Sequence, residues 1–189
     1  TSLVAKILSD QKLDPTIING GVINSLKSNA KLGKGDWSIL EADESDGSFL
    51  KLPINYSIVT NVDCEHLDYY KKYKNLENSF VEFINKTPPT GKAIICLDNK
   101  NVRKILKKIK NKNILTYGEN INANYVITKI KYNLDNTSFN LSFKDREKKR
   151  KLIKNINVKL LGKHNVLNAT AAFIVCLNLG ADQNIIKKS

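Results

Sequence analysis

The sequence has little of what marks membrane, secreted or zinc-binding proteins. Its 189 residues contain three cysteines, one tryptophan and no run of 18 apolar residues, so no membrane span is expected. The first residues, "TSLVAKILSD", lack the basic start and apolar run of a signal peptide. Cys64, Cys96 and Cys176 lie too far apart for a metal-ligand motif or a disulfide framework. We therefore expect a reduced, cytoplasmic setting with no membrane partner.

Arginine is also scarce, although the net charge is +13. Nearly all basic residues are lysine, and only Arg103, Arg146 and Arg150 carry the guanidinium fork that suits phosphates and base edges. The abundance of Lys, Asn and Ile indicates compositional drift in an AT-rich genome. We therefore expect no nucleic-acid partner. The alternative is a basic nucleic-acid-binding domain, which salt-dependent binding to DNA or RNA would support.

Against this basic background, one segment is acidic. Residues 41–68 hold seven acids and a single base, Lys51, for a net charge of −6. Four of the carboxylates fall within "EADESDGSF" at 41–49. Because like charges repel, such clustering usually needs a cation or hydrogen-bond donors, although a solvated loop is the simpler alternative.

Short apolar runs alternate with helical patterns over the first two thirds of the chain, which predicts an α/β fold with a doubly wound, mostly parallel sheet. Helices are expected over 2–12, over 67–86 and around Val102–Ile109, with a stop at "TPPTG". A short strand is expected between two turns in "DPTIING", and further strands are expected at 37–42, 56–61, 92–98 and 113–118.

The pattern changes at residue 123. Alternating segments around Asp135-Asn136 predict a hairpin, "KDREKKRK" a charged turn, and "INVKLL" a third strand, so that 123–160 forms a small antiparallel extension. Residues 165–179 are apolar on nearly all sides, which predicts a buried helix that ends at Gly180. We expect one domain over 1–181, with 182–189 as the start of a link to a further domain.

Carboxylates follow two of the expected parallel strands. Glu41 closes "WSILE", and Asp63, Glu65, His66 and Asp68 follow "YSIVTN". Ligands bind beyond the carboxyl ends of strands in such sheets, and oxygen-rich sites suit Mg²⁺ together with phosphate oxygens. The sequence thus favours metal-assisted nucleotide chemistry, although it contains no G-x-x-x-x-G-K-[ST] phosphate loop.

Three segments in this order, "EADESDGSF", "TNVDCEHLDYY" and "GKHNVLNATAA", resemble the central ATP-binding domain of the Mur ligases. "DPTIINGGVIN" and "EADESD" resemble the alanine-adding branch, and a muropeptide-recycling branch is the alternative within the family. The resemblance implies an enzyme that uses ATP and Mg²⁺ to join L-alanine to UDP-N-acetylmuramate through an acyl phosphate, in peptidoglycan precursor synthesis.

By motif, the resemblance implies that Glu41 and His66 are catalytic residues that bind magnesium. A surface carboxylate and a neighbour of a helix cap are the plainer alternatives for these two residues. The roles of Asp43, Glu44 and Asp46 stay open between metal-shell, amine-binding, capping and solvated positions.

The segment "GKHNVLN" implies that Asn165 and Asn168, three apart on one helical face, contact the adenine edge, with His164 bordering the base. Ordinary N-capping by Asn165 is the alternative. The family's carbamylated lysine cannot be placed, because Lys74 is not at the expected spacing.

The resemblance also locates the family's phosphate loop and first strand immediately before Thr1. We therefore expect the 189-residue chain alone not to turn over ATP.

Overall fold

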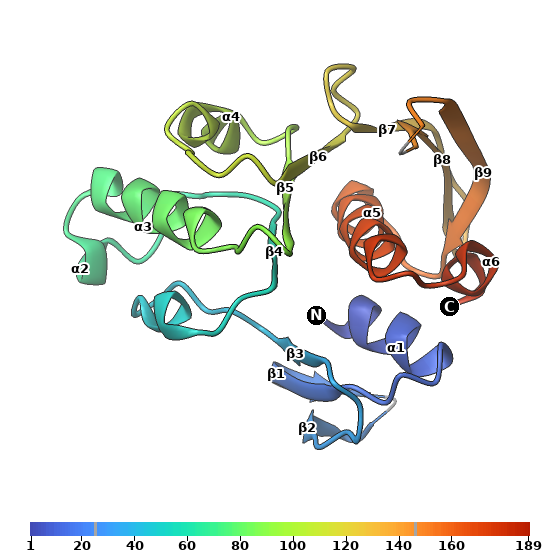
Figure 1. Cartoon of the computed structure of the whole chain (residues 1–189), viewed down its shortest axis with the longest axis horizontal. Helices are drawn as coiled ribbons and strands as arrows, with labels where there is room; N and C mark the ends of the chain where they lie inside the picture. The colour runs from blue at the N-terminus through green and yellow to red at the C-terminus, as the bar shows by residue number, and fades with distance from the viewer. Residues whose placement is uncertain (25, 146) are drawn as a thin grey trace. The chain divides into compact units, whose positions relative to one another are not determined.

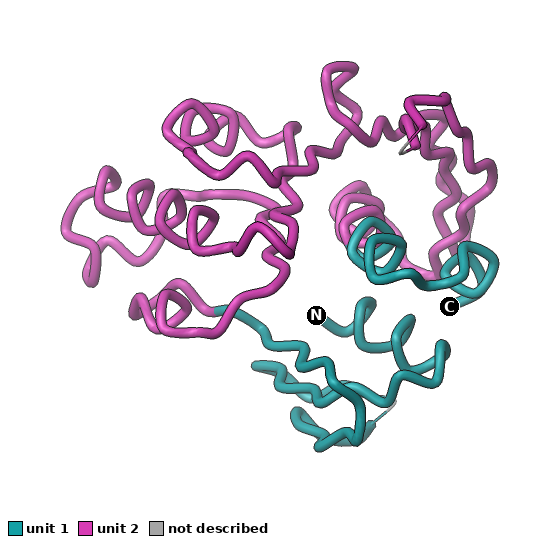
Figure 2. The backbone as a smooth tube through the Cα atoms, in the orientation of Figure 1, with its two compact units in different colours: residues 1–42, 172–189 teal, residues 43–171 magenta. Residues whose placement is uncertain are grey.

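The computed structural model describes residues 1–24, 26–145 and 147–189. Its helices are α1 (Ser2–Asp10), a 3-10 turn (Ser48–Lys51), α2 (Leu67–Tyr70), α3 (Tyr73–Asn85), α4 (Lys100–Leu106), α5 (Lys163–Asn178) and α6 (Gln183–Lys188). Its strands are β1 (Thr16–Ile23), β2 (Ser28–Lys31), β3 (Ser38–Leu40), β4 (Tyr56–Val59), β5 (Lys92–Cys96), β6 (Ile114–Gly118), β7 (Tyr125–Tyr132), β8 (Thr137–Lys144) and β9 (Arg150–Val158) (Figure 1). They form two compact units, 1–42 with 172–189 and 43–171 (Figure 2).

The first unit contains a three-stranded sheet in the order β2-β1-β3. β1 pairs with β3 in parallel, and it pairs with β2 in an antiparallel arrangement that the sequence analysis missed. Ile17 and Ile23 of β1 pack with Ala5 of α1 in a small apolar core. In the same unit, Asp182 is the N-cap of α6, and its carboxylate accepts hydrogen bonds from the amides of Asn184 and Ile185.

The second unit contains a six-stranded sheet in the order β4-β5-β6-β7-β8-β9. The pairs from β4 to β7 are parallel, and those from β7 to β9 are antiparallel. Apolar runs fill β4 and β5 because both faces of a parallel sheet are covered by helices. Phe49, Val59, Ile84, Ile95 and Ile105 belong to the core that results. The α/β fold class and the antiparallel extension are confirmed.

The extension differs from expectation at its last strand. β9 begins at Arg150, inside the segment expected to be a charged turn, and Arg146 of that segment lies outside the described residues. Tertiary pairing decides this, because Arg150 and Lys151 lie opposite Lys144 and Phe143 of β8. Ladder hydrogen bonds form regardless of the charge of a solvent-facing side chain.

The expected helix over 67–86 is divided. Lys71 adopts φ 62° between α2 and α3, a conformation that ends an α-helix. Asn75 Nδ2 donates to the carbonyl oxygen of Tyr70, 2.8 Å away, and so satisfies a group that the break exposes. No glycine or proline marks the break in the sequence.

One further expectation concerns the end of an element. α5 ends as predicted: Gly180 has φ 85°, and the N–H of Ala181 donates to Cys176 O in the bonding pattern of a left-handed C-cap. β3 and β4, the two strands that are followed by candidate acidic residues, belong to separate sheets and units. Among the described helices, none has the length and apolarity needed to cross a membrane.

Candidate functional site

Glu41 lies at the carboxyl end of the parallel pair β1–β3 in the first unit. Its N–H donates to Ile18 O at 2.9 Å, which extends the ladder by one residue. Its side chain is exposed, and Oε2 accepts a hydrogen bond from the N–H of Gly20 at 3.0 Å. The carboxylate is therefore held at the strand end, where ligands of parallel sheets bind.

The acidic loop that follows contains two tight side-chain turns in the second unit. Asp43 Oδ1 accepts from the N–H of Ser45 at 2.8 Å, and Asp46 Oδ1 accepts from the N–H of Ser48 at 2.9 Å. Hydrogen bonds from Ser45 and Ser48 lower the pKa of Asp43 and Asp46, respectively. These two carboxylates shape the loop, and Asp46 does so at the start of the 3-10 turn.

Glu44 lies in the same loop but faces His66. Its Oε1 is 3.9 Å from His66 Nε2, and Oε2 of Glu65 is also 3.9 Å from that nitrogen. Donor atoms of the three residues all lie within 4.8 Å of one another. Two carboxylates and an imidazole at this separation have the donor types and charge that fit a divalent cation.

His66 reaches this position through an unusual backbone. It precedes α2 in the left-handed region, with φ 56° and ψ 34°, and its carbonyl oxygen accepts from the amides of Tyr69 and Tyr70. The Tyr70 hydroxyl in turn donates to Glu44 O at 2.6 Å. The short helix therefore ties the acidic loop to the histidine, and desolvation raises the pKa of the Tyr70 hydroxyl.

A further carboxylate, which the sequence analysis did not select, follows β5. Asp98 accepts hydrogen bonds from the N–H groups of Glu119 (3.0 Å) and Asn120 (3.1 Å), which follow β6. Gly118 has φ 146°, and a Cβ there would overlap the Asp98 carboxylate. Asp98 thus fixes the loop after β6 at the carboxyl edge of the sheet.

The start of α5 meets this loop. Lys163 forms an ion pair with Glu119, and this contact raises the pKa of the Lys163 ammonium. Gly162 has φ 97°, and a Cβ on it would lie 2.9 Å from Cε1 of His164. Glycine therefore allows the imidazole of His164 to fold back over the turn that begins the helix.

The two asparagines of the "GKHNVLN" segment lie on this first part of α5. Asn165 Nδ2 donates to Leu161 O at 2.8 Å, so its side chain holds the preceding loop rather than accepting from the helix amides as an N-cap would. Asn168, one turn on, and His164 are exposed. Their contact with adenine stays a prediction.

Lys74 lies elsewhere, near the start of α3. Its Nζ is 4.0 Å from Oε2 of the buried Glu77, which Lys108 Nζ contacts at 2.7 Å. The neighbouring Lys108 lowers the pKa of Lys74. The cluster joins α3 to the turn that follows α4.

The structure thus brings His66 together with Glu44 and Glu65, and Lys163, which immediately precedes His164, joins the start of α5 to Glu119 of the loop after β6. Glu41 belongs to the other unit and is described only within it. The sequence signal for Asp98 was available: like Glu41, it is a carboxylate at the end of a buried strand, in "KAIICLD". No sequence signal distinguished Glu44 from Asp43 and Asp46.

Comparison with known proteins decides the family. The family described as "Mur ligase middle domain" matches residues 1–176. The chain belongs to the Mur ligase family. The resemblance of its three motifs is confirmed, and this Mur ligase domain matches its relatives over its whole length.

A UDP-N-acetylmuramate–L-alanine ligase of Pelagibacter ubique is 52% identical over 188 residues, which is 100% of this chain and 40% of the relative. The UDP-N-acetylmuramate-alanine ligase of Thermotoga maritima has the same fold, with a TM-score of 0.80 and 22% identity over 99% of this chain and 40% of that one. A second Thermotoga maritima ligase, determined in complex with ADP, has a TM-score of 0.73 and 17% identity over 100% of this chain and 44% of that one. The chain spans about two fifths of the length of the curated relatives that it matches.

Proposed function

We propose that this chain is the middle domain of a ligase that uses ATP to join L-alanine to UDP-N-acetylmuramate, a step of peptidoglycan precursor synthesis in the cytoplasm. The observation that carries the proposal is the 52% identity, over the whole chain, to an enzyme of that name. The carboxylates and imidazole at the strand ends support it, because they offer the groups that nucleotide and cation binding require.

The proposed reaction has two steps. A carboxylate oxygen of the muramyl group attacks the γ-phosphorus of ATP, and ADP leaves. The amine of L-alanine then attacks the acyl phosphate carbonyl, loses a proton, and phosphate leaves as the amide forms. Positioning and electrostatic stabilisation supply most of the catalysis in phosphoryl transfer, so the domain's contribution is to hold the nucleotide.

Adenine is assigned to the start of α5. The exposed side chains of His164 and Asn168 and the half-buried Asn165 offer a ring face and amide groups for the base. Asp98 fixes the loop after β6 by accepting a hydrogen bond from its backbone, and the Lys163–Glu119 ion pair joins that loop to α5. The ADP complex of the Thermotoga maritima relative is consistent with nucleotide binding by this fold.

Magnesium binding is assigned separately to Glu41 in the first unit and to the group of Glu44, Glu65 and His66 in the second unit. Glu44, Glu65 and His66 present donor atoms within 4.8 Å of one another, and Glu41 presents a carboxylate at the end of β3. When bound, the ion would neutralise phosphate charge. The protein's own part is to fix the donors: Gly20 holds Glu41, and Tyr70 holds the backbone of Glu44.

The domain is proposed to extend over residues 1–181, with 123–160 as its antiparallel extension and 182–189 as the start of a link. The sites for the sugar nucleotide and for L-alanine are then shared with parts of the protein outside this chain.

The test is an assay on the gene product that contains this chain, with ATP, Mg²⁺, UDP-N-acetylmuramate and L-alanine. Phosphate release that requires both substrates, together with the mass of the alanylated product, is the expected result. Turnover with the peptide L-alanyl-γ-D-glutamyl-meso-diaminopimelate in place of L-alanine would assign the protein to the muropeptide-recycling branch instead. No ATP-dependent ligation with either amine would refute the proposal.

A further inference from the structure

Two β-bulges lie side by side in the antiparallel extension, on either side of β8. On β7, Lys129 and Ile130 lie opposite the single residue Phe139, between the pairs Thr128–Asn140 and Lys131–Ser138. On β9, Lys154 and Asn155 lie opposite Asn140, between the pairs Leu141–Ile153 and Phe139–Ile156. The neighbouring residues Phe139 and Asn140 of β8 therefore each face an extra residue, Phe139 on the side of β7 and Asn140 on the side of β9.

Each bulge contains a residue in the left-handed region. Lys129 and Asn155 both have φ 54°, a conformation that costs free energy for any residue other than glycine, least of all for asparagine. The second bulge is fixed by a side chain, because Asn140 Oδ1 accepts from the N–H of Asn155 at 3.0 Å. Bulges redirect side chains and often occur next to binding sites.

A cavity of about 290 Å³ lies at the two bulges. Lys129, Lys131 and Lys154 line it together with hydroxyl and amide side chains of Thr128, Ser138, Asn140 and Asn155, and with Phe139 and Leu152. None of these nine lining residues is acidic. Lys129 and Lys131 bring two ammonium groups to one cavity, and their shared positive charge favours an anion there.

The segment that surrounds the cavity adds further positive charge. Residues 123–160 carry ten basic and three acidic residues, so this fifth of the chain supplies +7 of the net charge of +13. The bulk of the charge therefore lies on an element that the proposed ligase chemistry does not use.

We propose that the cavity between the two bulges binds a small phosphate-bearing anion. Lysine binds phosphate as a point charge, and the hydroxyl and amide groups of the lining supply hydrogen-bond donors. The two positive groups of Lys129 and Lys131 match an anion with more than one negative charge. A cavity bounded by three strands fits a compact ligand, whereas a nucleic-acid strand needs a continuous groove with aromatic stacking platforms.

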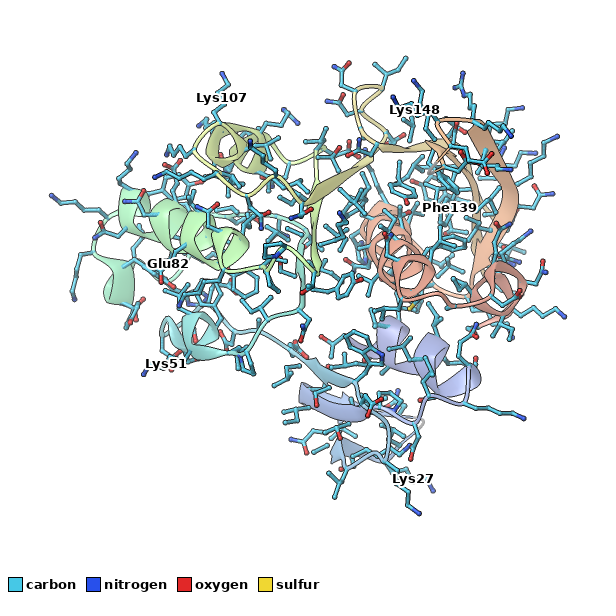
Figure 3. The ribbon with its side chains drawn as sticks, viewed as in Figure 1. Lys27, Lys51, Glu82, Lys107, Phe139 and Lys148 are labelled. Carbon is cyan, nitrogen blue, oxygen red and sulfur yellow. The ribbon has the colours of Figure 1, made fainter. Side chains whose placement is uncertain are left out.

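The test uses inorganic pyrophosphate as the probe, in metal-free buffer at constant ionic strength, followed by amide chemical shifts of the labelled chain. Saturable shifts at Thr128, Ser138 and Asn155 are expected. The double variant Lys129→Gln/Lys131→Gln should weaken binding about tenfold or more, because it removes two charges at the cavity. The matched control, Lys104→Gln/Lys107→Gln, removes the same charge from the end of α4, where Lys107 extends away from the ribbon (Figure 3), and should change affinity less than about twofold.

Unfolding midpoints show whether the variants keep their fold. If the double variant unfolds, Lys131→Gln alone gives the same test with a loss of several-fold expected. Shifts that fail to saturate, or equal weakening in both double variants, would mean that the lysines are a solvated basic face and would overturn the proposal. Competition by single-stranded RNA with a steep salt dependence would overturn it in favour of a nucleic-acid surface. The experiment measures amide chemical shifts in the antiparallel extension, so its outcome does not depend on ligase activity.

Discussion

Gly118 lies so close to Asp98 that no Cβ fits between its Cα and the Asp98 carboxylate. The same carboxylate accepts two backbone hydrogen bonds from the residues after Gly118. One glycine and one aspartate thus join the ends of β5 and β6 at the edge of the sheet where the nucleotide is proposed to bind.

Gly118→Ala is expected to lower the free energy of unfolding by about 1–3 kcal/mol, because φ 146° is unfavourable for alanine and the methyl group would displace Asp98. Urea unfolding measures the change. The control is Gly21→Ala, where a Cβ would meet nothing within 4 Å, and its effect should stay within about 1 kcal/mol. Equal effects of the two substitutions would contradict the role assigned to Asp98.

Tyr70→Phe is expected to destabilise the protein by about 1 kcal/mol, since it removes the hydrogen bond from the buried tyrosine to Glu44 O. It should also weaken Mn²⁺ binding, followed by electron paramagnetic resonance, because the loop that carries Glu44 loses its anchor. Tyr69→Phe is the matched control, as the neighbouring ring is half exposed. If Mn²⁺ affinity is the same in both variants, Tyr70 does not position the cation donors.

The three thiols are expected to differ sharply in reactivity. Cys64 is exposed, whereas Cys96 and Cys176 are buried, and burial raises the pKa of Cys96 and raises that of Cys176 to about 12. A raised pKa favours the neutral thiol, which is a poor nucleophile, so these two should stay unmodified up to about pH 9. Mass spectrometry after iodoacetamide treatment should find one modified cysteine in the folded chain and three after denaturation. Modification of Cys176 under native conditions would show that its helix opens readily.

Glu41→Ala and His66→Ala are each expected to reduce ligase turnover at least about a hundredfold in the gene product that contains this chain, with little change in stability. The reason is that each removes a proposed cation ligand from a solvent-accessible position. Turnover and urea unfolding are measured together, and Glu82→Ala, an exposed acid on α3, is the control. Near-normal turnover in either variant would remove that residue from the proposed metal site.

Local sequence patterns predicted much of the fold. Alternation placed β7 at 125–132, and Gly180 ended α5 as expected, because a single residue type allows the left-handed cap. The carboxylates after β3 and β4 indicated the carboxyl ends of these strands as the place of the candidate site residues. In these cases the determining interaction lies within a few residues along the chain.

Other features had no local signal. Lys71, Lys129 and Asn155 have positive φ angles that their residue types do not demand. Lys129 and Asn155 lie in bulges that pairing with β8 creates. Arg150 and Lys151 extend β9 because β8 offers a free edge, although their charges suggested a turn.

The sequence by itself determined the family, the alternation of helices and strands, and the candidate residues Glu41, His66, Asn165 and Asn168. Only the tertiary structure decided that Glu44 and Glu65, rather than Asp43 and Asp46, face His66, and that Asp98 fixes the loop beside α5. The physical reason is that a carboxylate's role depends on which groups approach it. In the acidic loop, two carboxylates bind their own backbone amides, and a third meets a histidine 22 residues away in the chain.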